Sequence, residues 1–148
     1  MYDHILVPTD GSDASAAALD QAVAIADRFG ARVEFLHVVD VGVQMSASAE
    51  GTIADELTTT LESVADDALT DAEARANDAG VDAETTILEG VPHDAIVRHS
   101  ADSEADLVVM GVTGRSGVAE RLLGSTTERV VRAAETSVLV ARTTDMSS

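Results

Sequence analysis

The sequence contains no cysteine and no lysine, and it has only two Phe, one Tyr and no Trp. The absence of cysteine excludes disulfides and thiolate metal sites. The absence of lysine excludes the Walker A phosphate loop and receiver-like phosphorylation domains, since both need a lysine amine. No apolar run approaches the roughly 18–20 residues that a membrane-spanning helix requires. The N-terminus has no basic segment followed by a long apolar one, so we expect no signal peptide and a soluble, cytoplasmic protein.

Positive charge is scarce, because 27 acidic residues face nine basic residues, all of them Arg, for a net charge of −18. Such a charge repels nucleic acids and anionic membranes, so neither is expected as a partner. Acidic chains with few aromatics can be disordered, but here 45% of residues are hydrophobic and lie in periodic segments. The composition therefore predicts a folded protein with a halophilic acidic surface. In salt of about 1 M the Debye length is only ~3 Å, which mutes the self-repulsion of that surface.

Apolar runs alternate with segments of helical periodicity along the 148 residues. This pattern predicts one α/β domain, residues 1–142, in which a parallel sheet is covered by helices on both faces, followed by a polar tail, residues 143–148. The long connection Asp40–Thr52 lacks periodicity. The expected strands are His4–Pro8, Arg32–Val39, Asp82–Leu88 at a sheet edge, Asp106–Met110 and Ser137–Ala141. The expected helices begin after Ser12 or Asp13, near Ile53, at Pro92 and at about Ser125, with Gly30 and Gly80 stopping the first two.

The stretch from Met110 to Thr126 carries the clearest functional signal. Gly111, Gly114 and Gly117 follow a buried strand, and Gly124–Thr126 (Gly-Ser-Thr) opens a helix. Glycines let the backbone approach a ligand closely, and a helix N-terminus offers free N–H groups and the positive end of a dipole. The stretch therefore predicts a phosphate-binding loop.

Other loop motifs do not match this stretch. Its G-x-x-G-x-x-G spacing differs from the dinucleotide fingerprint, and Ser116 lacks the glycine two residues later that a nucleophile elbow needs. An FMN site usually relies on aromatic stacking, and the three aromatic residues lie outside the candidate loops.

A second polar segment, Pro8-Thr9-Asp10, follows the first strand. In doubly wound sheets ligands bind outside the carboxyl ends of the strands at a topological switch point. If the first and fourth strands are neighbours, Thr9, Asp10 and the glycine stretch face one crevice.

The pattern Gly111-x2-Gly114-x9-Gly124-Ser125 after a strand resembles the ATP-binding signature of the universal stress protein (UspA-like) family. The resemblance covers nearly the whole chain. It also includes Ile5–Ser12, His37–Asp40, Gly90–Val97 and Ser137–Val140, which are similar to the family's opening strand and loop, second strand end, third-helix start and final strand.

The resemblance implies ATP as ligand, with or without Mg²⁺ or Mn²⁺ bound through its phosphates. Asp10 would lie near the ribose and the metal-phosphate end, and the backbone of Val38 would read the adenine edge. Thr113 departs from the His or Arg common at its position, which puts a side-chain phosphate contact there in doubt, and Arg115 could supply positive charge instead. The nucleoside walls would be Pro8, Thr9 and Met110, and the ribose and phosphates would be wrapped by Gly111, Val112, Gly114, Gly124, Ser125 and Thr126.

The sequence thus predicts a three-layer α/β/α domain with a five-stranded parallel sheet, order 3-2-1-4-5, that binds ATP and acts as a nucleotide-dependent stress regulator. Slow ATP hydrolysis and a dimeric interaction protein without nucleotide dependence remain as alternatives. Vigorous hydrolysis is disfavoured, because Asp10 is the only obvious base and there is no lysine, so no catalytic residue is assigned. The resemblance implies a homodimer through Thr136–Ala141. The four histidines share no ligand spacing, so no metal site is predicted from them.

Overall fold

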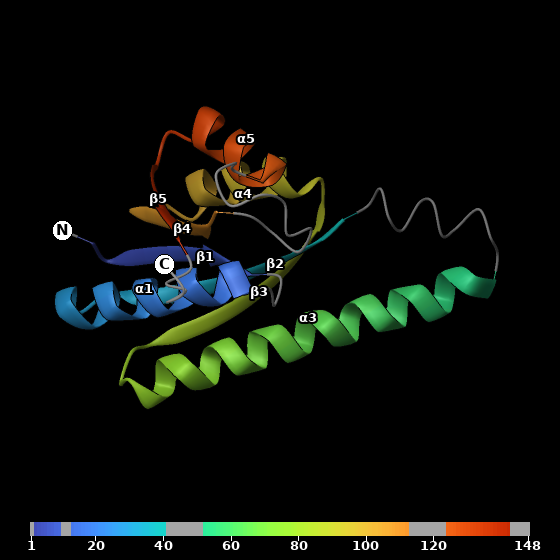
Figure 1. Cartoon of the computed structure of the whole chain (residues 1–148), viewed down its shortest axis with the longest axis horizontal. Coiled ribbons are helices and arrows are strands. Elements are labelled where there is room, and N and C mark those ends of the chain that lie inside the picture. Colours follow the sequence, from blue (N-terminus) through green and yellow to red (C-terminus); the bar gives the residue numbers. More distant parts are fainter. Residues whose placement is uncertain (1, 10–12, 41–51, 113–123, 143–148) are drawn as a thin grey trace.

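The computed structural model describes residues 2–9, 13–40, 52–112 and 124–142. Five parallel strands form one sheet in the order β3-β2-β1-β4-β5, which confirms the predicted topology. Figure 1 shows the strands running through the middle of the molecule between two layers of helices. The strands are β1 (His4–Pro8), β2 (Arg32–Asp40), β3 (Ala83–Gly90), β4 (Leu107–Gly111) and β5 (Ser137–Ala141).

Helices α1 (Asp13–Phe29) and α3 (Thr52–Asp78) cover one face of the sheet, and α4 (Pro92–Asp102) and α5 (Ser125–Ala133) cover the other (Figure 1). The connections β1–α1–β2 and β2–α3–β3 therefore lie on one side, and those through α4 and α5 lie on the other. The side changes where β1 neighbours β4, which is the topological switch point of the sheet.

In the core beneath α1 and α3, the helices contribute mostly alanine, which lets them pack closely on the larger side chains of the sheet. Phe35 of β2 is fully buried there, together with Ile5 and Val7 of β1. The helices contribute residues at three- and four-residue spacing, which is the period of one helix face. These are Ala18, Leu19, Ala22 and Ala26 from α1, and Ala65, Leu69, Ala72 and Ala76 from α3.

The opposite face has a smaller core, in which Leu6, Leu36 and Val108 pack beneath Ile96 of α4 and Val130 of α5. Its amphipathic α5 buries Val130 completely and exposes 43% of Val131. Within the part of the chain that the structure describes, no helix is both long enough and apolar enough to span a bilayer.

The element boundaries differ from the prediction at a few ends. β2 continues to Asp40 because it stays paired with β3 up to the partners Asp40 and Gly90. Gly111, predicted as the first residue of the loop, is instead the last residue of β4, because it pairs with Ala141 of β5. The predicted helix stops are confirmed, since Gly30 follows α1 with φ +68°, a left-handed conformation that favours glycine. The connection 41–51 and the tail 143–148 lie outside the described residues.

Candidate functional site

The carboxyl ends of β1 and β4 lie side by side. The two strands are paired in parallel, with Ile5 opposite Leu107 and Leu6 opposite Val108. The residues that follow them, Thr9 and Val112, therefore emerge at the same edge of the sheet. This confirms that the first and fourth strands are neighbours, the condition under which the two predicted segments meet at one crevice.

Thr9 is held rigidly at the β1 side of this edge. It is 8% exposed, and its N–H donates to the carbonyl oxygen of Leu36 at 2.8 Å. Its own carbonyl oxygen lies 3.0 Å from Nδ1 of His37, which must carry the proton in that hydrogen bond. Its hydroxyl lies 3.2 Å from Oγ of Ser15 in α1. The next residue, Asp10, lies outside the described residues, and its predicted place at the ribose and the metal-phosphate end stays a prediction.

On the β4 side the chain leaves the sheet and returns to it at one point. The N–H of Val112 donates to the carbonyl oxygen of Ala141 at 3.1 Å, and the N–H of Gly124 donates to the carbonyl oxygen of Val112 at 2.8 Å. The hydroxyl of Thr127 donates to the carbonyl oxygen of Gly111 at 2.9 Å. These bonds close the base of the segment 113–123. Thr113, Gly114 and Arg115 belong to that segment and lie outside the described residues.

Helix α5 begins at this closure, with Gly124 as its N-cap at φ −62° and ψ 155°. Glycine has no side chain to cap the helix, so the first N–H groups, those of Ser125 and Thr126, lack the usual side-chain acceptor. Ser125 is exposed and Thr126 is half-buried. An anion placed at this end would meet backbone N–H groups, two hydroxyls and the positive end of the helix dipole.

The remaining predicted residues lie on the neighbouring strands. Pro8 ends β1 and is half-buried, and Val38 of β2 is half-buried and paired with Leu88. Met110 is 5% exposed and belongs to the core beneath α4 and α5. A ligand in the crevice would therefore meet the backbone of Met110 more than its side chain.

Sequence reasoning did not single out the residues that fix this geometry. Thr127 and His37 hold the loop base and the end of β1, but neither belongs to the glycine pattern. Thr127 could have been recognised from the sequence, because it is a polar residue one turn from Val130 on the inward face of α5. Ser15 gave no comparable signal.

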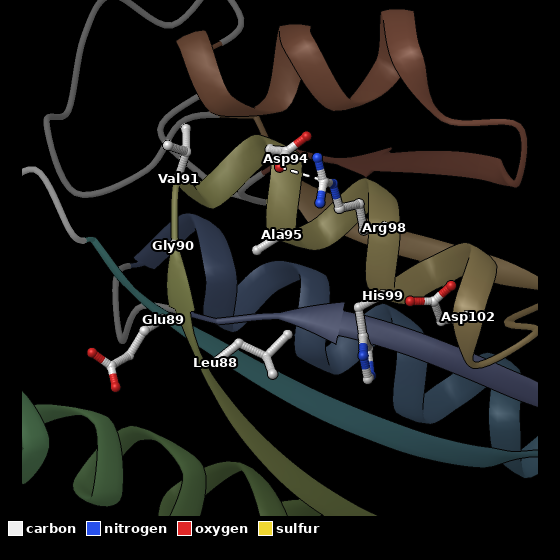
Figure 2. Close-up of a pocket in the computed structure, with 9 residues that line it drawn as sticks. All are labelled: Leu88, Glu89, Gly90, Val91, Asp94, Ala95, Arg98, His99 and Asp102. Atoms are coloured by element: carbon white, nitrogen blue, oxygen red, sulfur yellow. Dashed lines mark ion pairs between the residues drawn. The ribbon is translucent and has the colours of Figure 1, made fainter.

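A separate groove lies between the end of β3 and α4, with a volume of about 290 Å³. None of the predicted nucleotide-binding residues lines it. Figure 2 shows Arg98 turned toward Asp94, with which it forms an ion pair at 3.0 Å, and His99 pointing from α4 toward the strands beneath. We place the candidate site where β1 and β4 end, because the switch point and the glycine-capped N-terminus of α5 coincide there. The groove is lined by Leu88, Glu89, Gly90, Val91, Asp94, Ala95, Arg98, His99 and Asp102.

Comparison with known proteins agrees with this architecture. The chain is 40% identical over 142 residues to the universal stress protein MJ0531 of Methanocaldococcus jannaschii, across 96% of this chain and 83% of that protein. Its fold is similar to the solved structure of MJ0577, with TM-score 0.84, 32% identity and 96% of each chain covered. MJ0577 is also a universal stress protein of M. jannaschii. The present chain is also similar to a universal stress protein solved in complex with cAMP. The TM-score is 0.70 and the identity 33%, and the match covers 96% of this chain and 98% of that one.

The model of the universal stress protein family matches residues 1–142, the range that the sequence predicts as a single domain. The match includes the two strand ends at the candidate site and all five strands of the sheet. The chain therefore belongs to the universal stress protein family.

Proposed function

We propose that this chain binds ATP in the crevice between β1 and β4 and acts as a cytoplasmic, nucleotide-dependent regulator in the stress response, with slow or no hydrolysis. One observation carries the proposal. The chain closes a loop base beside the end of β1, through the Gly124–Val112 hydrogen bond, and starts α5 there with a glycine N-cap. A phosphate needs such N–H groups and an approach without a Cβ in the way.

In this proposal the described residues take different parts of the ligand. The N–H groups and hydroxyls of Ser125 and Thr126 bind the phosphates. The N–H of Gly124 is already bonded to Val112, so Gly124 contributes close approach rather than a donor. Gly111 and Val112, at the end of β4, lie beside the ribose and phosphates. The backbone of Val38 faces the adenine, with Pro8, Thr9 and Met110 as the walls.

The residues of the site that lie outside the described ranges enter the proposal from the sequence alone. Asp10 lies near the ribose and the metal-phosphate end, where Mg²⁺ or Mn²⁺ is bound through the phosphates. Gly114 lets the loop backbone follow the phosphates, and Arg115 supplies positive charge in place of a side-chain contact from Thr113. The relative solved with cAMP supports an adenine nucleotide as the ligand class, since it is 33% identical over 96% of this chain.

Hydrolysis is expected to be slow, because phosphoryl transfer needs charge neutralisation and an oriented water. The chain has no lysine to neutralise the phosphates, and Asp10 is the only obvious base. A slow ATPase is the second candidate function. Timed turnover of Mg-ATP in concentrated KCl separates the two, since a regulator that holds ATP releases at most about one phosphate per chain over many hours while an ATPase turns over repeatedly.

We also propose a homodimer through Thr136–Ala141. Strand β5 is an edge of the sheet, and its Val138, Leu139 and Val140 are only half-buried. Pairing with a second copy would cover this edge and its apolar side chains. Light scattering should give twice the chain mass, and the mass of one chain would contradict the pairing.

The first test of the nucleotide is purification of the protein without added nucleotide, followed by mass analysis of the small molecules released on denaturation. We expect adenine nucleotide in about one copy per chain. The absence of adenine nucleotide, together with no thermal stabilisation by Mg-ATP, would contradict the proposal and favour an interaction protein that does not depend on nucleotide.

A further inference from the structure

A buried polar cluster lies under α4, on the face of the sheet opposite α1 and α3. Glu34 of β2 is 4% exposed, and its carboxylate is shared by two histidines. Nε2 of His4 lies 2.8 Å from its Oε1, and Nε2 of His99 lies 2.6 Å from its Oε2. The hydroxyl of Thr86 donates to Oε2 at 2.6 Å. Glu84, next to Glu34 across the β2–β3 pair, adds a second carboxylate at the rim.

This cluster is distinct from the nucleotide crevice. His4 is the first residue of β1, Glu34 the third of β2 and Glu84 the second of β3. The cluster therefore lies at the amino ends of the strands, whereas the crevice lies at their carboxyl ends.

We propose that His4, Glu34 and Glu84 form a binding site for one divalent transition-metal ion of the Zn²⁺ class. One ring nitrogen of His4 and one carboxylate oxygen from each glutamate all lie within 4.8 Å of one another. In a tetrahedral site with Zn–N and Zn–O bonds of about 2.0–2.2 Å, ligand atoms lie ~3.3–3.6 Å apart. The carboxylate of Glu84 must therefore move inward, and Nε2 of His4 and Oε1 of Glu34, now 2.8 Å apart, must separate slightly to admit the ion. Glu84, whose side chain is 55% exposed, has the freedom to make this movement.

The surroundings of the ligands are those of a metal site. A metal-bound histidine generally donates its other ring N–H to a backbone carbonyl or a carboxylate, which fixes the ring. Nδ1 of His4 lies 3.3 Å from the carbonyl oxygen of Ser103, and this leaves Nε2 directed at Glu34. Metal-bound carboxylates are in turn hydrogen-bonded. Thr86 and His99 do this for Glu34 through its other oxygen, Oε2.

Charge also favours a dication here. Two carboxylates and one neutral imidazole balance a dication, and a buried charge is tolerated when it coordinates a metal. The proton on Nε2 of His4 leaves to solvent when the metal takes its place.

The donor set selects among metals. Imidazole suits Zn²⁺ and its first-row neighbours, whereas Mg²⁺ prefers an octahedral shell of oxygens and water. A fourth position would be taken by water. The ion can enter from the side of Glu84, and the nearby Arg32, at 3.6 Å from Oε1 of Glu84, is itself 55% exposed and can move aside.

The test is a calorimetric titration of ZnCl₂ into the full chain, free of metal and nucleotide, in excess Mg²⁺ to occupy the acidic surface. We expect one Zn²⁺ per chain and a rise in Tm on binding. Glu84→Gln should weaken the affinity at least about tenfold, since even outer-shell changes have effects of that size. Glu89→Gln is the matched control, an exposed glutamate of the same strand that lies outside the cluster, and should bind as the wild type does.

His4→Gln should abolish Zn²⁺ binding. Because His4 is buried, that variant can fail to fold, and the exposed Glu84→Gln variant then still tests the proposal. The proposal is overturned if no 1:1 binding occurs, or if the Glu84 and Glu89 variants bind Zn²⁺ equally. Either result would leave the cluster as a hydrogen-bonded network that only stabilises the sheet, and would leave the nucleotide proposal untouched.

Discussion

The amide N–H of Gly124 donates a 2.8 Å hydrogen bond to the carbonyl oxygen of Val112, so the two ends of the segment between them meet at the edge of the sheet. The hydroxyl of Thr127 adds a second tie to Gly111. The first turn of α5 is thereby fixed to the end of β4, beside the end of β1. These ties can therefore act on the stability of the fold, on the binding of a ligand, or on both.

Thr127→Val removes the hydroxyl that bonds the carbonyl oxygen of Gly111 while keeping the side-chain volume. Thr127 is 4% exposed, so the change leaves a buried acceptor without its donor. We expect the free energy of unfolding to fall by about 1–3 kcal/mol in urea denaturation. We expect ATP affinity to fall as well, because the first turn of α5 is no longer fixed.

The control for this variant is Thr85→Val, the same change at an exposed position of β3. It should alter the free energy of unfolding by less than about 0.5 kcal/mol. Equal stability of the Thr127 variant and the wild type would show that the tie to Gly111 contributes nothing.

Gly124→Ser should separate binding from stability. The φ of −62° and ψ of 155° at Gly124 are open to any residue, and serine is a favoured helix N-cap. We expect an unchanged or slightly higher Tm. In the proposed site, however, the new Cβ stands where the phosphate approaches, so ATP affinity should fall by about tenfold, or ~1.4 kcal/mol.

Gly30→Ala is the opposite case. Gly30 has φ +68°, with no atom within 4 Å of an added Cβ, so the cost is backbone strain of about 1–2 kcal/mol. It lies at the end of α1 remote from the crevice and should leave ATP affinity intact. The proposal for Gly124 would be contradicted if both variants lost ATP affinity only in proportion to their loss of stability. The close approach of a phosphate would then not explain why residue 124 is a glycine.

Arg115→Gln tests the source of positive charge in a site without lysine. We expect weaker ATP binding by calorimetry, by several-fold, because a charge-assisted phosphate contact is lost. The control is Arg28→Gln, which makes the same charge change in the last turn of α1. This turn lies at the amino ends of the strands, away from the proposed site. Unchanged affinity in the Arg115 variant would remove this residue from the proposed site.

The pH dependence of stability should include a contribution from Asp106. Its Oδ2 accepts hydrogen bonds from the N–H groups of Asp3 at 2.9 Å and His4 at 3.0 Å, and these lower its pKa below the usual 3.8. The unfolded chain therefore protonates first, so the stabilisation is present above about pH 4 and is lost as the pH falls through the lower pKa of the folded state.

Asp106→Asn keeps an acceptor oxygen but cannot titrate. Urea denaturation between about pH 5 and pH 2 should show a shallower fall in the free energy of unfolding for this variant than for the wild type. Asp67→Asn, on the exposed face of α3, is the control. Parallel curves for all three proteins would contradict the contribution of Asp106.

Salt should strengthen the binding of ATP to a chain with net charge −18. Raising KCl from about 0.1 M to 1 M shortens the Debye length from ~10 Å to ~3 Å and screens the repulsion between protein and nucleotide. We expect a lower Kd and a higher Tm at 1 M. A steep loss of ATP affinity at 1 M KCl would contradict this. It would mean that the attraction of the phosphates to a nearby positive charge, such as Arg115, outweighs their repulsion by the net negative charge of the protein.

The sequence predicts the fold closely because local signals and topology agree. Apolar strands such as Ile5–Val7 alternate with helices, and Gly30 and Gly80, which have φ of +68° and +75°, follow the first two helices as predicted. The glycine stretch also indicates which strands are neighbours. A ligand site shared with Pro8-Thr9-Asp10 requires β1 to pair with β4, and the structure shows this pairing.

The polar interior was not predicted, because it depends on contacts between residues far apart in the chain. His4 and His99 look unrelated in sequence, yet β1 and α4 bring both onto Glu34. A charged residue between Val33 and Phe35 was the available signal, since a glutamate in the middle of a buried strand needs partners. Its partners follow only from the order of the strands.

The most direct test of the central claim is a crystal structure of the protein with ATP. The account predicts phosphates at the N–H groups of Ser125 and Thr126, with the adenine edge against the backbone of Val38. Nucleotide density elsewhere, as in the groove between β3 and α4, or no nucleotide density in crystals grown at saturating ATP, would contradict it.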